Sequence, residues 1–277
     1  MRRIHRVTIL GAGNIGVAIA KGMLESGLLS ADHITLTRRR THLLDEMRTQ
    51  GFRVEKDNIK AVRDADVILI AVEPQRIDEL LDEICDALDP EKHIVISVAT
   101  GVCIGRLSQR LGDEITIIRA MPNTAIAVRE SMTCIATDSF DDEKLDVAVS
   151  LFESVGSVLR IPEEDMNAAT ALGSCGIAFF LQAIRAASQG GIEIGFSAAE
   201  ALAIAAQTAK GAAELLEKTG SHPAAEIDKV TTPRGCTIVG LNQLEHEGFG
   251  SALIKGIKTS AEKAAQLYPN SGGLNEN

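Results

Sequence analysis

The stretch that decides the fold lies near the start of the chain and reads Val7-Thr-Ile-Leu-Gly-Ala-Gly-Asn-Ile-Gly16. Its first four residues form an apolar run typical of a short strand, and a helical spacing of apolar residues follows over 17–24. A strand, a Gly-x-Gly-x-x-Gly turn and a helix in this order are typical of dinucleotide binding. Gly11 would make the turn, Gly13 would let the backbone approach a pyrophosphate, and Gly16 would pack the helix against the strand. A glycine turn of a sheet that binds no cofactor is the alternative.

Strand and helix patterns alternate through roughly the first 160 residues. The predicted strands cover residues 7–10, 33–37, 66–72, 93–98, 114–119 and 157–161, and a helix is predicted over Thr41 to Gln50. Continuous apolar runs are typical of strands that are buried on both faces. The pattern therefore predicts a doubly wound, mostly parallel α/β domain of the Rossmann type over residues 1–162.

The sequence pattern changes after Pro162, where strand patterns end and alanine-rich helical patterns begin. We expect a helix from Asp165 to Gln189 that ends at Gly190-Gly191, and an all-α dimerisation domain over residues 163–270. Residues 271–277 are expected to form a disordered tail.

A second helix of this domain has clear signals at both ends. Ser197-Ala-Ala-Glu200 is a capping box, and Thr219-Gly220 marks the end. Because residues 198–213 are small and apolar on almost every face, we expect a partner subunit to cover this helix.

Composition excludes several classes of protein. The 277 residues include 28 basic and 38 acidic side chains, for a net charge of −10, and only 3% are aromatic, so we predict no nucleic-acid partner. The chain shows no apolar run of the length that spans a bilayer and no signal peptide at its start, so we expect no membrane partner and a cytoplasmic location.

Five cysteines with no Cys-x-x-Cys pair predict neither a disulfide framework nor a zinc ribbon. We expect all five to be buried, reduced thiols. The histidines show no ligand spacing, so we predict no metal site.

The residues at the end of the second predicted strand indicate which of the two nicotinamide cofactors, NAD or NADP, is preferred. An enzyme that uses NAD usually has an acidic residue there, whereas this chain has Thr37-Arg-Arg-Arg40. Guanidinium groups bind phosphate bidentately, so Arg38, Arg39 and Arg40 favour the 2′-phosphate of NADP. An exposed basic turn is the alternative.

Two later segments have the character of ligand loops. Arg119-Ala-Met-Pro-Asn-Thr124 closes a strand at the expected ligand-binding edge of the sheet, although an ordinary turn would look the same. Val230-Thr-Thr-Pro-Arg-Gly-Cys-Thr237 precedes a helical pattern and presents backbone amides that suit a carboxylate, although a plain helix cap explains it equally well.

Together these motifs resemble the pyrroline-5-carboxylate reductase family over nearly the whole chain. The resemblance rests on residues 11–16, Asp57-Asn58, 65–75, 119–124, and most specifically on 230–241 with Leu244-Glu245 and Gly248-Phe249. It implies NADPH-dependent reduction of 1-pyrroline-5-carboxylate, a cyclic imine, to L-proline, with NADH bound at lower affinity. It also implies a homodimer with intertwined helical domains, which in many members assembles into decameric rings.

The resemblance also implies roles for individual residues. The pyrophosphate would lie on Gly11, Ala12, Gly13, Asn14, Ile15 and Gly16, the 2′-phosphate on Arg38, Arg39 and Arg40, the adenosine ribose on Asn58, and the nicotinamide half on Ala71, Val72, Glu73, Pro74, Met121, Pro122 and Asn123. Substrate would contact Thr232, Gly235, Cys236 and Thr237 of the partner subunit, and Thr237 would be catalytic, with its hydroxyl facing the imine nitrogen.

This chain departs from the family pattern in the substrate loops. It has Gly173-Ser-Cys-Gly-Ile-Ala178, Arg234 and Cys236 where the family generally has other residues, and Glu73 where a lysine is usual. A glycine in place of Arg234 would permit positive φ, which is strained for an arginine. Substrate preference therefore stays open between pyrroline-5-carboxylate and another cyclic imine.

Two further alternatives stay open. A non-catalytic NADP-binding regulator would keep the fold without the chemistry. A β-hydroxyacid dehydrogenase is disfavoured because proteins of that kind carry a catalytic lysine on the first helix of the second domain, and residues 165–189 contain no lysine.

Overall fold

The computed structural model describes residues 4–267, so the expectation of a disordered tail over 271–277 lies outside the described residues. The chain divides into two compact units. One contains the chain up to Cys175 together with the chain from Ser260 onwards, and the other contains Gly176–Thr259. Each unit is described by itself.

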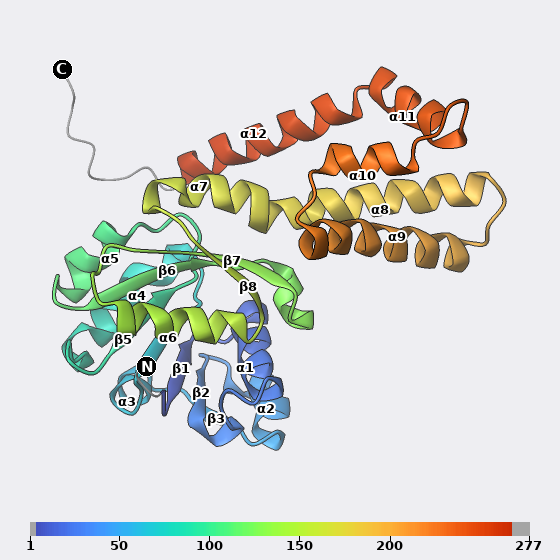
Figure 1. Ribbon diagram of the computed structural model, residues 1–277. Coiled ribbons are helices and arrows are strands. Elements are labelled where there is room, and N and C mark those ends of the chain that lie inside the picture. The colour runs from blue at the N-terminus through green and yellow to red at the C-terminus, as the bar shows by residue number, and fades with distance from the viewer. Residues whose placement is uncertain (1–3, 268–277) are drawn as a thin grey trace, which may run out of the picture. The chain divides into compact units, whose positions relative to one another are not determined.

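The first unit is built on one eight-stranded sheet (Figure 1). Its strands are β1 (Val7–Leu10), β2 (Ile34–Thr37), β3 (Arg53–Glu55), β4 (Val67–Ile70), β5 (Ile94–Ser97), β6 (Thr116–Met121), β7 (Ser131–Thr137) and β8 (Gly156–Arg160). They lie in the order β3-β2-β1-β4-β5-β6-β7-β8, and all neighbouring strands are parallel except β6 and β7. The predicted doubly wound α/β sheet is confirmed.

Sequence patterns missed β3 and β7. The strand β3 has only three residues, which is too short for a pattern. The strand β7 runs antiparallel to β6 because the short 3₁₀ segment η5 (Thr124–Val128), rather than a crossover helix, connects them.

Helices cover both faces of this sheet. They are α1 (Asn14–Glu25), α2 (Asp45–Thr49), α3 (Asn58–Arg63), α4 (Ile77–Ile84), α5 (Ile104–Leu111), α6 (Asp142–Glu153) and α7 (Met166–Ala169), with short 3₁₀ segments η1 (Ala31–His33), η2 (Thr41–Leu44), η3 (Pro74–Arg76), η4 (Cys85–Ala87) and η6 (Glu163–Asp165). Alternate strand residues point to opposite faces, so Ile9 packs in the core with α1, α2 and α6, whereas Leu10 packs in the core with α3, α4 and α5. The helix predicted over 41–50 is η2 followed by α2.

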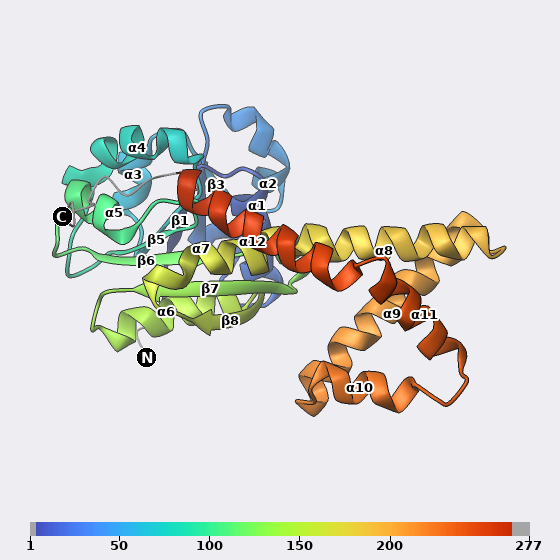
Figure 2. The same cartoon turned by 90° about the horizontal axis from the view of Figure 1, so that it is seen from above.

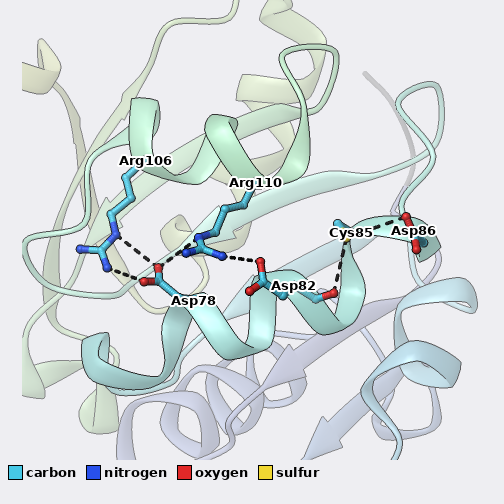
Figure 3. A network of polar contacts seen from close by, with 6 residues as sticks. All are labelled: Asp78, Asp82, Cys85, Asp86, Arg106 and Arg110. Atoms are coloured by element: carbon cyan, nitrogen blue, oxygen red, sulfur yellow. Dashed lines mark hydrogen bonds and ion pairs between the residues drawn. The ribbon is translucent and has the colours of Figure 1, made fainter. Parts of the chain in front are cut away.

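Figure 3 shows how ion pairs join α4 to α5. Asp78 accepts a hydrogen bond of 2.7 Å from Arg106 Nη2 and lies 3.5 Å from Arg110 Nε, and Arg110 also binds Asp82. The hydrogen bond from Arg106 lowers the pKa of Asp78 below its ordinary value. The buried residues Ile77, Leu80, Leu81 and Ile84 hold the same helix to the core. These contacts fix the position of α4.

The second unit is helical (Figure 2). It contains α8 (Gly176–Glu193), α9 (Ala198–Thr219), α10 (Pro223–Val230), α11 (Cys236–His246) and the first part of α12 (Phe249–Leu267). The capping box is confirmed, because Ser197 accepts from Glu200 N and Glu200 accepts from Ser197 N. The predicted end at Gly220 is also confirmed, with φ of 65°.

The predicted helix end at Gly190-Gly191 is wrong, because α8 continues to Glu193. Gly191 does not end the helix but allows α8 to pack closely against α9, because a Cβ atom on it would lie 3.0 Å from Ala201 Cβ. A π-helical turn (η7) over Thr170–Cys175, which the sequence did not predict, precedes α8.

Large apolar side chains lie exposed over the second unit. Among them are Phe180, Leu181, Ile194 and Leu202, with Ile194 78% exposed. The stretch Glu163–Glu193 is long and apolar enough to cross a membrane by length and composition. That is weak evidence for a span, because a helix that another subunit covers has the same composition.

The cysteines differ from their prediction. Cys134 is buried, and burial raises the pKa of its thiol. Cys85, Cys103 and Cys175 are half-buried and Cys236 is exposed, so the prediction of five buried thiols is wrong for four of them. Cys236 is exposed because it occupies the first turn of α11, away from any core. Within residues 4–267, no cluster of three or more candidate metal ligands occurs.

Candidate functional site

The glycine turn lies where the strand order of the sheet reverses. β1 pairs with β2 on one side and with β4 on the other, and open α/β sheets bind ligands in the crevice at such a point. Backbone amides of Gly11 and Ala12 donate to Thr37 O at 3.2 and 2.8 Å. Gly11 has φ of 84°, and a Cβ atom on it would lie 2.5 Å from Val72 Cγ1. Only glycine is accommodated at this turn.

The N-terminus of α1 is open to an anion. Its N-cap is Gly13, no side chain caps it, and its first turn contains no acidic residue. The first helical amide that bonds within the helix is that of Val17, which donates to Gly13 O at 2.9 Å. The amides of Asn14, Ile15 and Gly16, which precede Val17 in the first turn, are therefore donors with the polarity that phosphate requires. Gly16 packs as expected, since a Cβ atom on it would lie 2.9 Å from Ile9 Cγ2.

A cavity of about 430 Å³ opens at this point of the sheet. Nine residues that were predicted to bind the cofactor line it: Gly11, Gly13, Arg38, Arg39, Arg40, Asn58, Ala71, Val72 and Glu73. Seven residues absent from the prediction also line it: Thr37, Leu43, Lys56, Arg76, Glu79, Leu80 and Glu83. An arginine cluster, a glycine turn and an uncapped helix in one cavity suit a phosphorylated dinucleotide.

Carboxylates from α4 pair with the predicted ligands. Arg39 Nη2 donates to both carboxylate oxygens of Glu79 at 2.7 Å, and Asn58 Nδ2 donates to Glu83 Oε2 at 2.9 Å. Glu79 and Glu83 are one helical turn apart on α4 and so share a face. That spacing would have shown from the sequence that the two acids share a helix face, but not that this face meets the site.

Other predicted cofactor residues lie off this lining. Asn14 lines a second cavity of about 470 Å³, which it shares with Gly13 and Arg38. Ala12 is buried, and Ile15, Gly16 and Pro74 flank the lining residues in sequence.

The predicted nicotinamide segment begins at Met121, the last residue of β6. Met121 and Pro122 are buried, and Asn123 caps η5 by accepting from Ala125 N at 2.9 Å. Asn123 Nδ2 also donates to Gly173 O at 3.3 Å, and its backbone amide donates to Ser131 Oγ at 3.1 Å. This segment is held tightly, but the structure does not bring it onto the lining of the first cavity.

The predicted substrate loop forms a tight turn before α11. Gly235 N donates to Thr232 O at 2.9 Å, and a Cβ atom on Gly235 would lie 2.4 Å from Thr232 Oγ1, so glycine is required. Arg234 has φ of 60°, in the left-handed region. No side chain caps α11, its first turn contains no acid, and Cys236 and Thr237 are exposed there. This is a second helix N-terminus with the polarity for an anion.

Comparisons with known proteins agree with both units. Residues 163–267 match the family described as pyrroline-5-carboxylate reductase dimerisation, and residues 6–101 match that described as NADP oxidoreductase, coenzyme F420-dependent. Pyrroline-5-carboxylate reductase 2 of Dictyostelium discoideum is 46% identical over 99% of this chain and 97% of its own length. Pyrroline-5-carboxylate reductase 1 of the same organism is 48% identical over 95% of this chain, which spans 50% of that longer protein.

Solved structures give the same result. A pyrroline-5-carboxylate reductase from Coxiella burnetii is 28% identical with a TM-score of 0.90, covering 97% of this chain and all of its own. Pyrroline carboxylate reductase from Plasmodium falciparum, solved with NADP bound, is 25% identical with a TM-score of 0.85, covering 96% of this chain and 99% of its own.

The sheet, its glycine turn and these matches define an NAD(P)-dependent oxidoreductase, with an NADP-binding domain followed by a helical dimerisation domain. The chain belongs to the pyrroline-5-carboxylate reductase family. Its dimerisation domain implies a homo-oligomer.

Proposed function

We propose that the protein reduces 1-pyrroline-5-carboxylate to L-proline, the last step of proline biosynthesis, in the cytoplasm. The observation that carries this proposal is 46% identity to a pyrroline-5-carboxylate reductase over nearly the full length of both chains. The domain assignment that accompanies it is a cofactor domain over 1–162 and a dimerisation domain over 163–270. Two subunits would intertwine through their exposed helical faces.

The first cavity is proposed as the cofactor site. The uncapped α1 N-terminus would hold the pyrophosphate, and Arg38, Arg39 and Arg40 would hold a 2′-phosphate. When bound there, NADPH supplies the hydride. Replacing the three arginines with glutamine should weaken NADPH binding far more than NADH binding, because only NADPH carries the 2′-phosphate. An equal loss for both cofactors would refute this assignment.

The loop before α11 is proposed as the substrate site. Amides of Gly235, Cys236 and Thr237 would bind the carboxylate, with Thr232 beside them, and Thr237 Oγ1 would hydrogen-bond the imine nitrogen. Reduction adds a hydride to the imine carbon and leaves a proton on nitrogen. A pyrroline nitrogen is basic enough to arrive partly protonated, so these residues would act by orienting the substrate rather than as strong acids.

The deciding experiment follows loss of NADPH absorbance when pyrroline-5-carboxylate is added to the purified protein, with L-proline identified as product and NADH tested in parallel. Rapid formation of proline supports the proposal. NADPH binding without turnover would refute it and leave two candidates. One is a reductase of another cyclic imine, which Arg234 in the substrate loop would favour, and the other is a regulator that binds NADP.

A further inference from the structure

The proposed 2′-phosphate ligand Arg39 already has an anionic partner. Its Nη2 atom donates to both oxygens of Glu79 at 2.7 Å, and both residues line the first cavity. The two side chains are well exposed, Arg39 at 62% and Glu79 at 67%. An ion pair this exposed is weak, so a ligand phosphate can open it at small cost.

Glu79 cannot move away with its helix. Asp78 and Asp82, on another face of α4, bind Arg106 and Arg110 of α5, as Figure 3 shows. Four buried apolar side chains of α4 add to this anchoring. Opening the Arg39 ion pair therefore requires rotation of side chains, and the carboxylate of Glu79 stays at the rim of the cavity.

A carboxylate at this place affects the two nicotinamide cofactors in opposite ways. It repels a 2′-phosphate and competes with that phosphate for Arg39, whereas it accepts a hydrogen bond from an unphosphorylated ribose hydroxyl. Glu73 and Glu83 line the same cavity and give it further negative charge beside the arginines. The cavity thus combines arginines, which are typical of NADP sites, with carboxylates, which are typical of NAD sites.

We propose that Glu79 is a residue that determines cofactor specificity. It competes with the 2′-phosphate for Arg39 and so reduces the difference between the affinity for NADPH and the affinity for NADH. This inference rests on the proposed cofactor site. It assigns a role to a residue of α4 that lies forty positions after Arg39 in the chain.

The test is calorimetric titration of the purified full chain with NADP⁺ and with NAD⁺, which needs no turnover. The variants are Glu79→Gln, Arg39→Gln and the double variant. Glu143→Gln is the matched control, because it makes the same charge change on the exposed first turn of α6, away from the cavity.

Glu79→Gln should raise NADP⁺ affinity roughly three- to fivefold, as expected for loss of one exposed charge interaction, and should not raise NAD⁺ affinity. Most of this gain should vanish in the Arg39→Gln background, and the control should bind both cofactors like the parent. An unchanged or lower ratio of NADP⁺ to NAD⁺ affinity in Glu79→Gln would overturn the inference. In that case the Arg39→Gln variant tells two failures apart. If it still weakens NADP⁺ binding, only the role of Glu79 is refuted; if it does not, the proposed phosphate site is refuted as well.

Discussion

Arg119 on β6 and Glu163 on η6 form an ion pair in which Nη1 lies 2.9 Å from Oε1. The side chain of Arg119 is 7% exposed and that of Glu163 is 33% exposed. The same Glu163 oxygen accepts the amide of Ile104, the first residue of α5, at 2.6 Å. One carboxylate thus connects β6, the start of α5 and the segment that leads to α7. Its partner Arg119 lies two residues before Met121, where the Met121 to Asn123 segment begins.

The two partners should not be equivalent when mutated. Glu163→Ala should lower the free energy of unfolding by roughly 2–4 kcal/mol, because Arg119 is left buried and unpaired. Arg119→Met should cost less, because water can reach the remaining carboxylate. Chemical denaturation at one protein concentration measures both, with the exposed neighbour variant Glu164→Ala as control. The reverse order of costs would contradict this account.

Replacement of Thr237 tests its proposed role in catalysis separately from cofactor binding. Thr237→Ala should lower kcat by roughly tenfold or more, because the substrate nitrogen loses its hydrogen-bond partner, with NADPH affinity unchanged. Thr237→Ser, which keeps the hydroxyl, should recover most of the activity. Steady-state kinetics and NADPH titration check both variants. Full turnover in Thr237→Ala would remove this residue from the mechanism.

The left-handed conformation of Arg234 predicts a stabilising substitution. Arg234→Gly should raise the free energy of unfolding by roughly 0.5–1 kcal/mol, because glycine adopts a φ of 60° without the steric cost that an L side chain meets. Arg234→Ala keeps this cost and should give no gain, although it removes the same charge. If alanine stabilises as much as glycine, charge rather than backbone strain is the cause.

Acid sensitivity should arise in part from His93. Its side chain is buried, Nδ1 accepts a hydrogen bond from Asp89 N at 2.9 Å, and Nε2 has no hydrogen-bond partner within residues 4–267. Burial, together with the charge of Lys92, lowers the pKa of His93 below its ordinary value of 6.5. Since the unfolded chain then binds more protons, the contribution of His93 to stability is complete above that value and is lost as the pH falls below it.

The free energy of unfolding should therefore decrease as the pH falls below about 6.5, by at most about 1.4 kcal/mol per pH unit for one proton. His93→Asn, which retains an acceptor for the Asp89 amide, should flatten this decrease. The exposed variant His5→Asn serves as control and should follow the parent. Parallel pH profiles for the parent and His93→Asn would exclude this group.

Much of the cofactor domain could be predicted from the sequence because its signals are local. Strand, glycine turn and helix are adjacent in residues 7–25, Gly11 has the positive φ of the turn, and Gly16 packs against Ile9 seven residues earlier. Capping at Ser197 and termination at Gly220 likewise depend on side chains within a few residues. Local interactions of this kind need no knowledge of the rest of the chain.

Failures occurred where the outcome depends on contacts between two different helices or strands. Gly191 resembles a helix stop, yet its contact with Ala201 makes it part of α8. The strand β7 pairs antiparallel with β6 because η5 returns the chain, and it pairs in parallel with β8 on its other side.

By itself the sequence determined the fold class, the glycine turn between β1 and α1, the arginine cluster and the resemblance to a reductase family. Tertiary structure alone placed Glu79 on Arg39 and Glu83 on Asn58, because folding brings the segments that follow β2 and β3 beside α4, the helix that follows β4. The charge of a binding cavity is a sum over side chains that meet only after folding. For that reason the arginines could be found from the sequence, whereas the carboxylates that oppose them could not.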